Sequence, residues 1–251
     1  MWCGWVVGVA LGICSARWPP VSQAQPSPGA NSIVALLDLA AQSAGKGVFG
    51  SGFVISSDGA VLTNAHVVLG AQRDPDHYRL VALWRAEWFS ASVVCASSLG
   101  ADSAALDYTQ MVNARRDVAE VRLGPAFVER SIELLGQRWR PHTGPLPRFA
   151  ALAFAGRDPA AGQQVETRGY VFGAAPPTLT MKRGRVLRLF NASDGTPVVT
   201  VRYTAPVEHG QSGAPIFDAS GDVVAMQTWG SASMPDDGAG IAQSVLRTPC
   251  L

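Results

Sequence analysis

Short apolar runs separated by glycine-bearing or charged turns dominate the chain after residue 50. The runs 53–55 and 61–63 flank the turn Ser56-Ser57-Asp58-Gly59, and an Asp-Gly pair between two such runs predicts a β-hairpin. Apolar clusters of about four to eight residues favour strands over helices. Further strands are therefore expected at 80–84, 90–95, 118–123, 163–171, 178–189, 198–203, 214–217 and 223–229.

The chain divides into two halves of similar style at a proline-containing segment, 138–148, which has no apolar periodicity. In each half a Ser-Gly pair leads into a hairpin, Ser51-Gly52 in the first and Ser212-Gly213 in the second. We therefore predict an all-β fold of two packed antiparallel β-barrels, with a site in the cleft between them. Within a domain over 32–251, barrel one covers about 32–137, the interbarrel linker 138–148 and barrel two about 149–251.

The hydrophobic pattern specifies the secondary structure less clearly near the start of the first half and the end of the second. Residues 33–41 fit either the apolar face of a helix or a first strand, and both readings stay open. The last residues, 241–251, are expected to begin as a strand and to end in a short helix.

The first 24 residues differ in kind from the rest. Residues 2–13 form an uninterrupted apolar and glycine run, and the stretch after it ends Val21-Ser22-Gln23-Ala24. This pattern is typical of a secretory signal peptide, so we expect segment 1–24 to be removed, a Pro/Ser/Gly linker at 25–31, and a secreted or periplasmic mature chain. About a dozen apolar residues are too few to cross a bilayer comfortably, and no stable membrane span is expected after cleavage.

Composition narrows the class of partner. The chain is 47% hydrophobic and 16% charged, a balance that supports a globular core. A formal net charge of +1 gives no reason to expect nucleic acid as a partner. No Cys/His cluster has zinc-ligand spacing, so neither metal nor cofactor is expected. Cys3 and Cys14 leave with the signal peptide, and whether Cys95 and Cys250 pair in the exported chain stays open.

Ser212 is the strongest candidate nucleophile. It follows Gly210-Gln211 and precedes Gly213 and an apolar run, and glycine lets the backbone adopt the tight turn that a substrate carbonyl must approach. The N–H groups of Gly210 and Ser212 are expected to converge as an oxyanion hole, with each donor worth about 3 kcal/mol. Ser51 is the rival nucleophile, but it lacks the small-Pro-apolar segment that follows Ser212 and is interpreted as a turn residue.

A serine nucleophile needs a base to take its proton. Among the four histidines, His66 directly follows an apolar strand, which would fix the position of its backbone. His77 and His142 lie in polar loops, and His209 stands three residues before Ser212, where it is expected at the rim of a pocket. We therefore assign His66 as the general base.

The base in turn needs an acid that orients its ring. Asp102, Asp107 and Asp117 all lie between His66 and the linker. Asp117 opens the expected strand 118–123, so its carboxylate can sit at the inner end of that strand. It is the preferred candidate.

Four segments, in this order, resemble the trypsin-like (chymotrypsin-fold) serine peptidases, most closely the bacterial HtrA-type and glutamyl-endopeptidase-like branch. They are Gly50-Ser51-Gly52-Phe53-Val54-Ile55, Leu62-Thr63-Asn64-Ala65-His66-Val67-Val68, Asp117-Val118-Ala119-Glu120-Val121-Arg122-Leu123 and Gly210-Gln211-Ser212-Gly213-Ala214-Pro215. The resemblance spans most of residues 32–250. It implies a double β-barrel in which His66 is the general base, Asp117 orients it and Ser212 attacks the scissile carbonyl.

The resemblance also implies where substrate binds. The segment Thr228-Trp229-Gly230 resembles the strand with which the substrate backbone pairs. The pocket for the side chain before the cut bond is expected at Pro206 and Val207, with His209 at its rim.

The residues of this pocket predict its preference. No acid stands at the expected floor, which argues against arginine or lysine, and Gln227 replaces the family's glutamate-reading histidine. A small or apolar side chain is therefore expected before the cut bond. Asp236 and Asp237 would overturn this if either reached the pocket.

Two departures from the family pattern bear on function. Gln211 stands where trypsin-like zymogens carry an aspartate that pairs with a freed N-terminus, so activation by that ion pair is not expected. The chain ends at Leu251, and we expect no peptide-binding PDZ domain of the kind that many HtrA-type proteins carry.

The sequence thus predicts an exported serine endopeptidase that acts on proteins or peptides through a Ser-His-Asp triad. The alternative is a catalytically weak or inactive peptidase-like module that binds peptides or partner proteins, suggested by Gln211 and by the divergent loops between Leu80 and Asp117. The oligomeric state, and a chaperone role that would depend on it, stay open.

Overall fold

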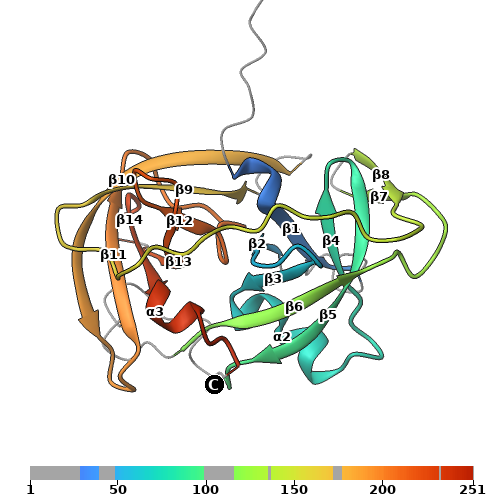
Figure 1. Ribbon diagram of the computed structural model, residues 1–251, viewed down its shortest axis with the longest axis horizontal. Coiled ribbons are helices and arrows are strands. Elements are labelled where there is room, and N and C mark those ends of the chain that lie inside the picture. Colours follow the sequence, from blue (N-terminus) through green and yellow to red (C-terminus); the bar gives the residue numbers. More distant parts are fainter. Residues whose placement is uncertain are drawn as a thin grey trace, which may run out of the picture.

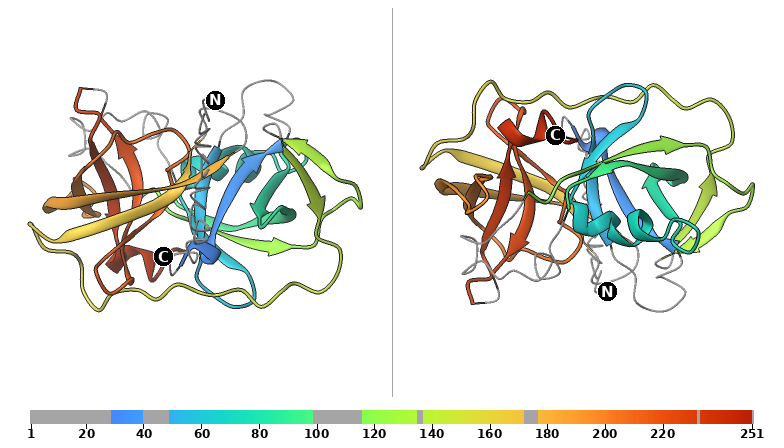
Figure 2. Two further views of the ribbon diagram at one scale, coloured as in Figure 1. Left: turned by 90° about the horizontal axis from the view of Figure 1, so that it is seen from above. Right: turned by 90° about the horizontal axis from the view of Figure 1, so that it is seen from below.

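A computed structural model describes residues 29–39, 49–98, 116–134, 137–171, 177–231 and 233–250. Two β-barrels lie side by side, one built from the blue-to-green strands and one from the gold-to-red strands (Figure 1 and Figure 2). The predicted all-β fold of two packed antiparallel barrels is confirmed. The expected signal peptide at 1–24 and the linker residues 25–28 lie outside the described residues.

The first barrel is closed by six antiparallel strands in the order β4-β1-β2-β3-β6-β5, with β5 pairing back onto β4. The strand reading of residues 33–41 is correct for 33–38, because β1 is buried along its whole length between β2 and β4. The strands are β1 (Ile33–Asp38), β2 (Phe49–Val54), β3 (Ala60–Thr63), β4 (Leu80–Trp84), β5 (Glu87–Ala96) and β6 (Ala119–Gly124).

Two short strands, β7 (Ile132–Leu134) and β8 (Gln137–Pro141), extend the first sheet beyond the barrel, and β8 runs parallel to β5. The segment expected as a linker therefore begins with a strand. Its Trp139 side chain is buried against Trp88, which explains why this stretch pairs despite its prolines. Residues 142–163, drawn in yellow, then cross one face of the molecule to the second barrel (Figure 1).

The second barrel is closed by six strands in the order β10-β11-β14-β13-β12-β9. They are β9 (Gln164–Val171), β10 (Thr178–Asn191), β11 (Pro197–Tyr203), β12 (Pro215–Phe217), β13 (Val223–Gly230) and β14 (Asp237–Ala242). The short helix α3 (Gln243–Leu246) follows β14, as predicted for the end of the chain. No helix among the described residues is long and apolar enough to cross a membrane.

Helix α2 (Ala65–Arg73) starts directly after β3, where the sequence suggested only a loop edge beyond a strand. Val67 and Val68 bury their side chains against the first barrel, although β-branched residues favour strands when nothing else decides. Packing thus overrides local preference. The consequence for the site is that His66 lies in the first turn of a helix, on a platform fixed to the barrel core.

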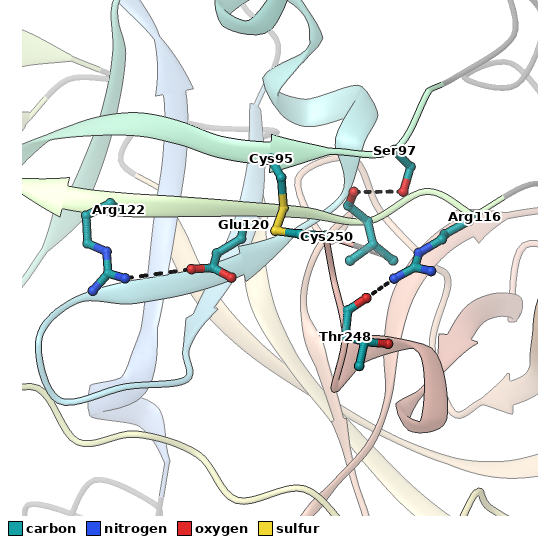
Figure 3. The surroundings of a disulfide bond; sticks show 8 residues. Cys95, Ser97, Arg116, Glu120, Arg122, Thr248 and Cys250 are labelled. Atoms are coloured by element: carbon teal, nitrogen blue, oxygen red, sulfur yellow. Dashed lines mark hydrogen bonds and ion pairs between the residues drawn. A yellow bond between two sulfur atoms is a disulfide. The ribbon is translucent and has the colours of Figure 1, made fainter.

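A disulfide between Cys95 and Cys250, which the sequence left open, links β5 of the first barrel to the chain after α3 (Figure 3). The Cα atoms are 5.6 Å apart, within the usual range for a disulfide. Beside it, the guanidinium of Arg116 donates a hydrogen bond to the carbonyl oxygen of Thr248 (Figure 3). The C-terminal segment is therefore attached to the first barrel immediately next to Asp117.

Candidate active site

Asp117 holds His66 through two contacts. Its Oδ2 lies 2.6 Å from His66 Nδ1, and its Oδ1 accepts a 3.0 Å hydrogen bond from the backbone N–H of His66. The second bond satisfies one of the N–H groups that the start of α2 leaves without an intrahelical partner, a role that the N-cap residue Asn64 does not fill. One carboxylate thus caps the helix and fixes the ring, and Nε2 is the nitrogen left for proton transfer.

Burial and Asp117 shift the pKa of His66 in opposite directions. Burial by itself lowers the pKa, because desolvation disfavours the charged ring. The attraction of the Asp117 carboxylate and its hydrogen bond to the ring both raise the pKa, and together they outweigh burial. The net pKa of His66 lies above its ordinary value, so the site stabilises the imidazolium that a general base becomes.

A hydrogen-bond bridge through Asn64 joins the acid to the second barrel. Asn64 Nδ2 donates to the carbonyl oxygen of Asp117 at 2.8 Å and to Thr228 Oγ1 at 2.9 Å. All three residues are buried. Thr228 falls at the register shift of the β13–β14 pair, between Gln227 and Trp229. The bridge therefore fixes the position of Thr228, at the register shift of β13, relative to Asp117.

Ser212 lies at the far end of the same bridge. Its hydroxyl donates to the carbonyl oxygen of Thr228 at 3.4 Å, and among the described residues this is the hydroxyl's one hydrogen bond. The bond goes to Thr228 and not to His66. Through Thr228 and Asn64, a continuous set of contacts connects Ser212 to Asp117 and from there to His66.

Ser51, the rival nucleophile, lies on β2 and is completely buried. Its backbone N–H donates to the carbonyl oxygen of Ser212 at 2.7 Å. Its hydroxyl donates to the carbonyl oxygen of Gly210 at 2.7 Å and accepts from the N–H of Tyr170 at 2.8 Å. A hydroxyl engaged in this way cannot reach a substrate, so Ser51 holds the loop that carries Ser212 instead of marking a turn.

The N–H groups of Gly210 and Ser212 donate to no acceptor among the described residues. Gly210 has φ 96°, a conformation that favours glycine. The carbonyl oxygen of Gln211 accepts from the N–H of Ala214 at 2.9 Å. Because N–H and C=O point in opposite directions across a trans peptide, this bond also fixes the direction of the Ser212 N–H, which shares that peptide unit.

The other titratable candidates are engaged elsewhere. His142 contacts Glu87 through Nδ1 at 3.0 Å, and the exposed His77 contacts Asp74. The alternative acids at 102 and 107 lie outside the described residues. Over the described part of the chain, no group of three or more His, Cys, Asp or Glu side chains is arranged to hold a metal ion.

A family model described as "Trypsin-like peptidase domain" matches residues 50–226, well over half of the chain. The chain belongs to the trypsin-like peptidase family. The matched range begins in β2 and ends in β13, so it covers part of each barrel. The resemblance predicted from the four sequence segments is confirmed.

Relatives of this trypsin-like peptidase include serine protease HTRA4 from Mus musculus, 27% identical over 179 residues. That match covers 71% of this chain and 29% of the relative, so the chain spans less than a third of its length. The active form of the Rv3671c protease from M. tuberculosis superposes with a TM-score of 0.58 at 23% identity, covering 96% of this chain and 92% of that one. The serine endoprotease from Yersinia pestis gives 0.56 at 16% identity, covering 88% and 61%. These structures share the fold.

Val207 and Gln227 of this trypsin-like peptidase, at the expected side-chain pocket, are neutral and lie against glycines. A Cβ added to Gly238 would lie 2.8 Å from Gln227 Nε2 and 3.0 Å from Val207 Cγ2, and one added to Gly230 would lie 3.4 Å from Val207. Tyr203 donates its hydroxyl proton to Gln227 Oε1 at 2.7 Å, and burial raises the pKa of Tyr203.

The remaining predicted pocket residues are spread around this region. Pro206 and His209 are exposed, whereas Trp229 is buried and its carbonyl oxygen accepts from Gln227 Nε2 at 2.6 Å. Asp237 is buried and holds Arg202 through both carboxylate oxygens, at 2.7 and 3.0 Å. That carboxylate is therefore committed to Arg202.

Sequence reasoning missed three residues that shape the site. The roles of Ser51 and Asn64 depend on contacts between the barrels, for which the sequence carries no separate signal. Lys182 was not detectable, because alternation with Met181 and Leu187 would place it on the outer face of the strand, whereas the structure buries Lys182 and exposes both apolar residues.

Proposed function

We propose that this chain is a serine endopeptidase that cleaves peptide bonds through Ser212, His66 and Asp117. The observation that carries the proposal is the two-point hold of Asp117 on His66, joined to Ser212 through Asn64 and Thr228. A base oriented in this way by an acid is what a serine hydroxyl needs to become a nucleophile.

In the proposed reaction, the Ser212 hydroxyl turns from Thr228 toward His66, and Nε2 takes its proton as Oγ bonds to the scissile carbonyl carbon. The resulting oxyanion accepts hydrogen bonds from the N–H groups of Gly210 and Ser212. His66 then gives its proton to the leaving amine, and the carbon–nitrogen bond breaks to leave an acyl-enzyme. Water, deprotonated by the same base, releases the acyl group and restores the serine.

The substrate class follows from the walls around the site. The substrate backbone pairs with the end of β13 at residues 228–230, a form of strand addition. Val207, Gln227 and Tyr203 place no charge beside the side chain before the cut bond, which supports a preference for small or apolar residues.

Export is the second part of the proposal. Residues 1–24 carry the pattern of a signal peptide. The Cys95–Cys250 disulfide supports a secreted or periplasmic location, because disulfides persist in oxidising compartments and are rare in the cytosol.

The test uses the chain from residue 25 onward, a fluorescent casein and a fluorophosphonate probe. We expect the unchanged protein to cleave casein and to be labelled at Ser212. We expect Ser212→Ala to lose labelling and on the order of a millionfold in turnover. Ser220→Ala, at an exposed turn, is the matched control and should behave like the unchanged protein. Full casein cleavage by Ser212→Ala would rule out the assignment.

One observation favours a second candidate function, a peptidase-like module that binds peptides without cleaving them. The Ser212 hydroxyl is bonded to Thr228 and not to His66. Peptide binding by a protein that the fluorophosphonate does not label would support this function, and labelling of Ser212 would reject it.

A further inference from the structure

Lys182 is a buried lysine at an unusual place in the second barrel, with 5% of its side chain exposed. Along β10, Lys182, Gly184 and Val186 face inward, whereas Arg183 and Arg185 are exposed. An ammonium group on the inner face of a strand loses its hydration, which is costly unless other polar groups replace the water.

All three acceptors that replace this water belong to residues 206–211. Lys182 Nζ donates to the carbonyl oxygen of Pro206, to Glu208 Oε2 at 2.7 Å and to Gln211 Oε1 at 3.0 Å. An ammonium group has three N–H donors, so residues 206–211 accept all the hydrogen bonds that Lys182 can donate. The backbone N–H of Glu208 also donates to Gln211 Oε1, at 3.0 Å, and closes the loop upon itself.

Gln211 links Lys182 to Ser212, the residue that bears the proposed nucleophile. Gln211 is 1% exposed, and its side chain is held by Lys182 on one side and bonded through Nε2 to Thr180 Oγ1 at 3.4 Å on the other. Lys182 and Thr180 both lie on β10, in the part of the strand, residues 178–185, that pairs with β9. The peptide unit after Gln211 contains the N–H of Ser212. The direction of that N–H is therefore tied to β10.

We propose that Lys182 is a positioning residue that holds residues 206–211 in the shape that forms the oxyanion hole. The inference rests on the proposed peptidase function. Because the cation comes from within the same barrel, the loop needs no newly freed chain end to order it. Lys182 acts on the developing oxyanion only through the N–H groups of Gly210 and Ser212.

Lys182→Met, which keeps the length of the side chain and removes its charge, tests the proposal. The substrate is an internally quenched peptide copied from the casein site that the unchanged protein cleaves, and the inhibitor is a peptide boronate of the same sequence. We expect kcat to fall about 100-fold, comparable to the loss of an oxyanion donor, with KM changed by less than about threefold. The boronate should bind correspondingly more weakly, because it needs the oxyanion hole, whereas the cleaved peptide product should bind as before.

Arg183→Met is the matched control, since it removes a cation from the outward face of the same strand and should keep full activity. Lys182→Arg, which retains the charge, should recover part of kcat. A folded Lys182→Met protein with unchanged kcat, or one in which only KM rises, would overturn the proposal.

Glu208→Gln decides the matter if Lys182→Met does not fold, because the Glu208 side chain is 49% exposed and tolerates the change. Loss of this partner should lower kcat several-fold at constant KM, and unchanged kcat would contradict the proposal. Failure of the peptidase assignment is recognised separately, since the unchanged protein would then neither cleave casein nor react with the fluorophosphonate.

Discussion

The hydroxyl of Ser51, on the first barrel, donates a 2.7 Å hydrogen bond to the carbonyl oxygen of Gly210, on the second, across 159 residues of sequence. The backbone N–H of Ser51 donates to the carbonyl oxygen of Ser212, two residues after Gly210. The loop with the proposed nucleophile is therefore held from both sides, by Ser51 from one barrel and by Lys182 from the other. The relative placement of the two barrels decides the geometry of the site.

Ser51→Ala should weaken both stability and catalysis. The change leaves the N–H of Tyr170 and the carbonyl oxygen of Gly210 without their buried partner, which costs about 1–3 kcal/mol in the free energy of unfolding. Urea unfolding measures this loss, and the rate of fluorophosphonate labelling measures the effect on the loop. Ser92→Ala, at an exposed position on β5, is the control and should change neither. Full stability and full labelling in Ser51→Ala would show that the hydrogen bonds of the Ser51 hydroxyl are dispensable.

The parts of the fold that sequence predicted are those fixed by local chemistry. The Asp58-Gly59 turn, the alternating run after Asp117 and the Ser212-Gly213 turn each carry their own signal, and the strands that follow or flank them appear where expected, whereas β7 and β8 were not expected. Helix α2 was missed because Val67 and Val68 favour strands, and only burial against the first barrel makes them helical.

The parts of the candidate site that sequence did not predict depend on distant partners. Nothing near Ser51 indicates that its hydroxyl meets Gly210, and nothing near Cys95 indicates that it meets Cys250. Such contacts follow from the register of whole barrels, which one sequence leaves open. Lys182 is a similar case, because alternation with Met181 and Leu187 indicates neither its inward direction nor its three acceptors.

The raised pKa of His66 predicts the acid side of the pH profile. The base must be neutral to accept a proton, so kcat/KM should rise with pH and reach half its maximum above the ordinary histidine value of about 6.5. Asp117→Asn removes the attraction that raises the pKa while burial remains, so the midpoint should move to lower pH. The same change should lower kcat by about 10⁴-fold, because the ring loses its orienting acid.

The measurement is kcat/KM across pH, with the ring protons of His66 followed by NMR. Asp74→Asn, beside the exposed His77, is the control and should leave the profile in place. A midpoint that does not move in Asp117→Asn would contradict the assignment of Asp117 as the group that sets the pKa of His66.

Removal of the Cys95–Cys250 disulfide should destabilise the protein. The bridge closes a separation of 155 residues, and loss of a native disulfide typically costs about 2–5 kcal/mol. The double change Cys95→Ser with Cys250→Ser should lower the melting temperature, and dithiothreitol should lower that of the unchanged protein but not of the double variant. Equal melting temperatures for the two proteins without reductant would show that the bridge adds no stability.

Substrate preference should follow the size of Val207. Its side chain stands against Gly230 and Gly238, on the walls of the expected pocket. Val207→Ala removes two methyl groups there, and differences of this size in an apolar pocket change discrimination by about 10- to 200-fold. We expect the unchanged protein to prefer alanine or valine before the cut bond, and Val207→Ala to shift toward leucine and phenylalanine.

A peptide panel varied at that position measures kcat/KM for each residue, with Val94→Ala, at an exposed position of the first barrel, as the control. Cleavage after lysine or glutamate by the unchanged protein, or an identical ranking in Val207→Ala, would contradict this assignment of the pocket.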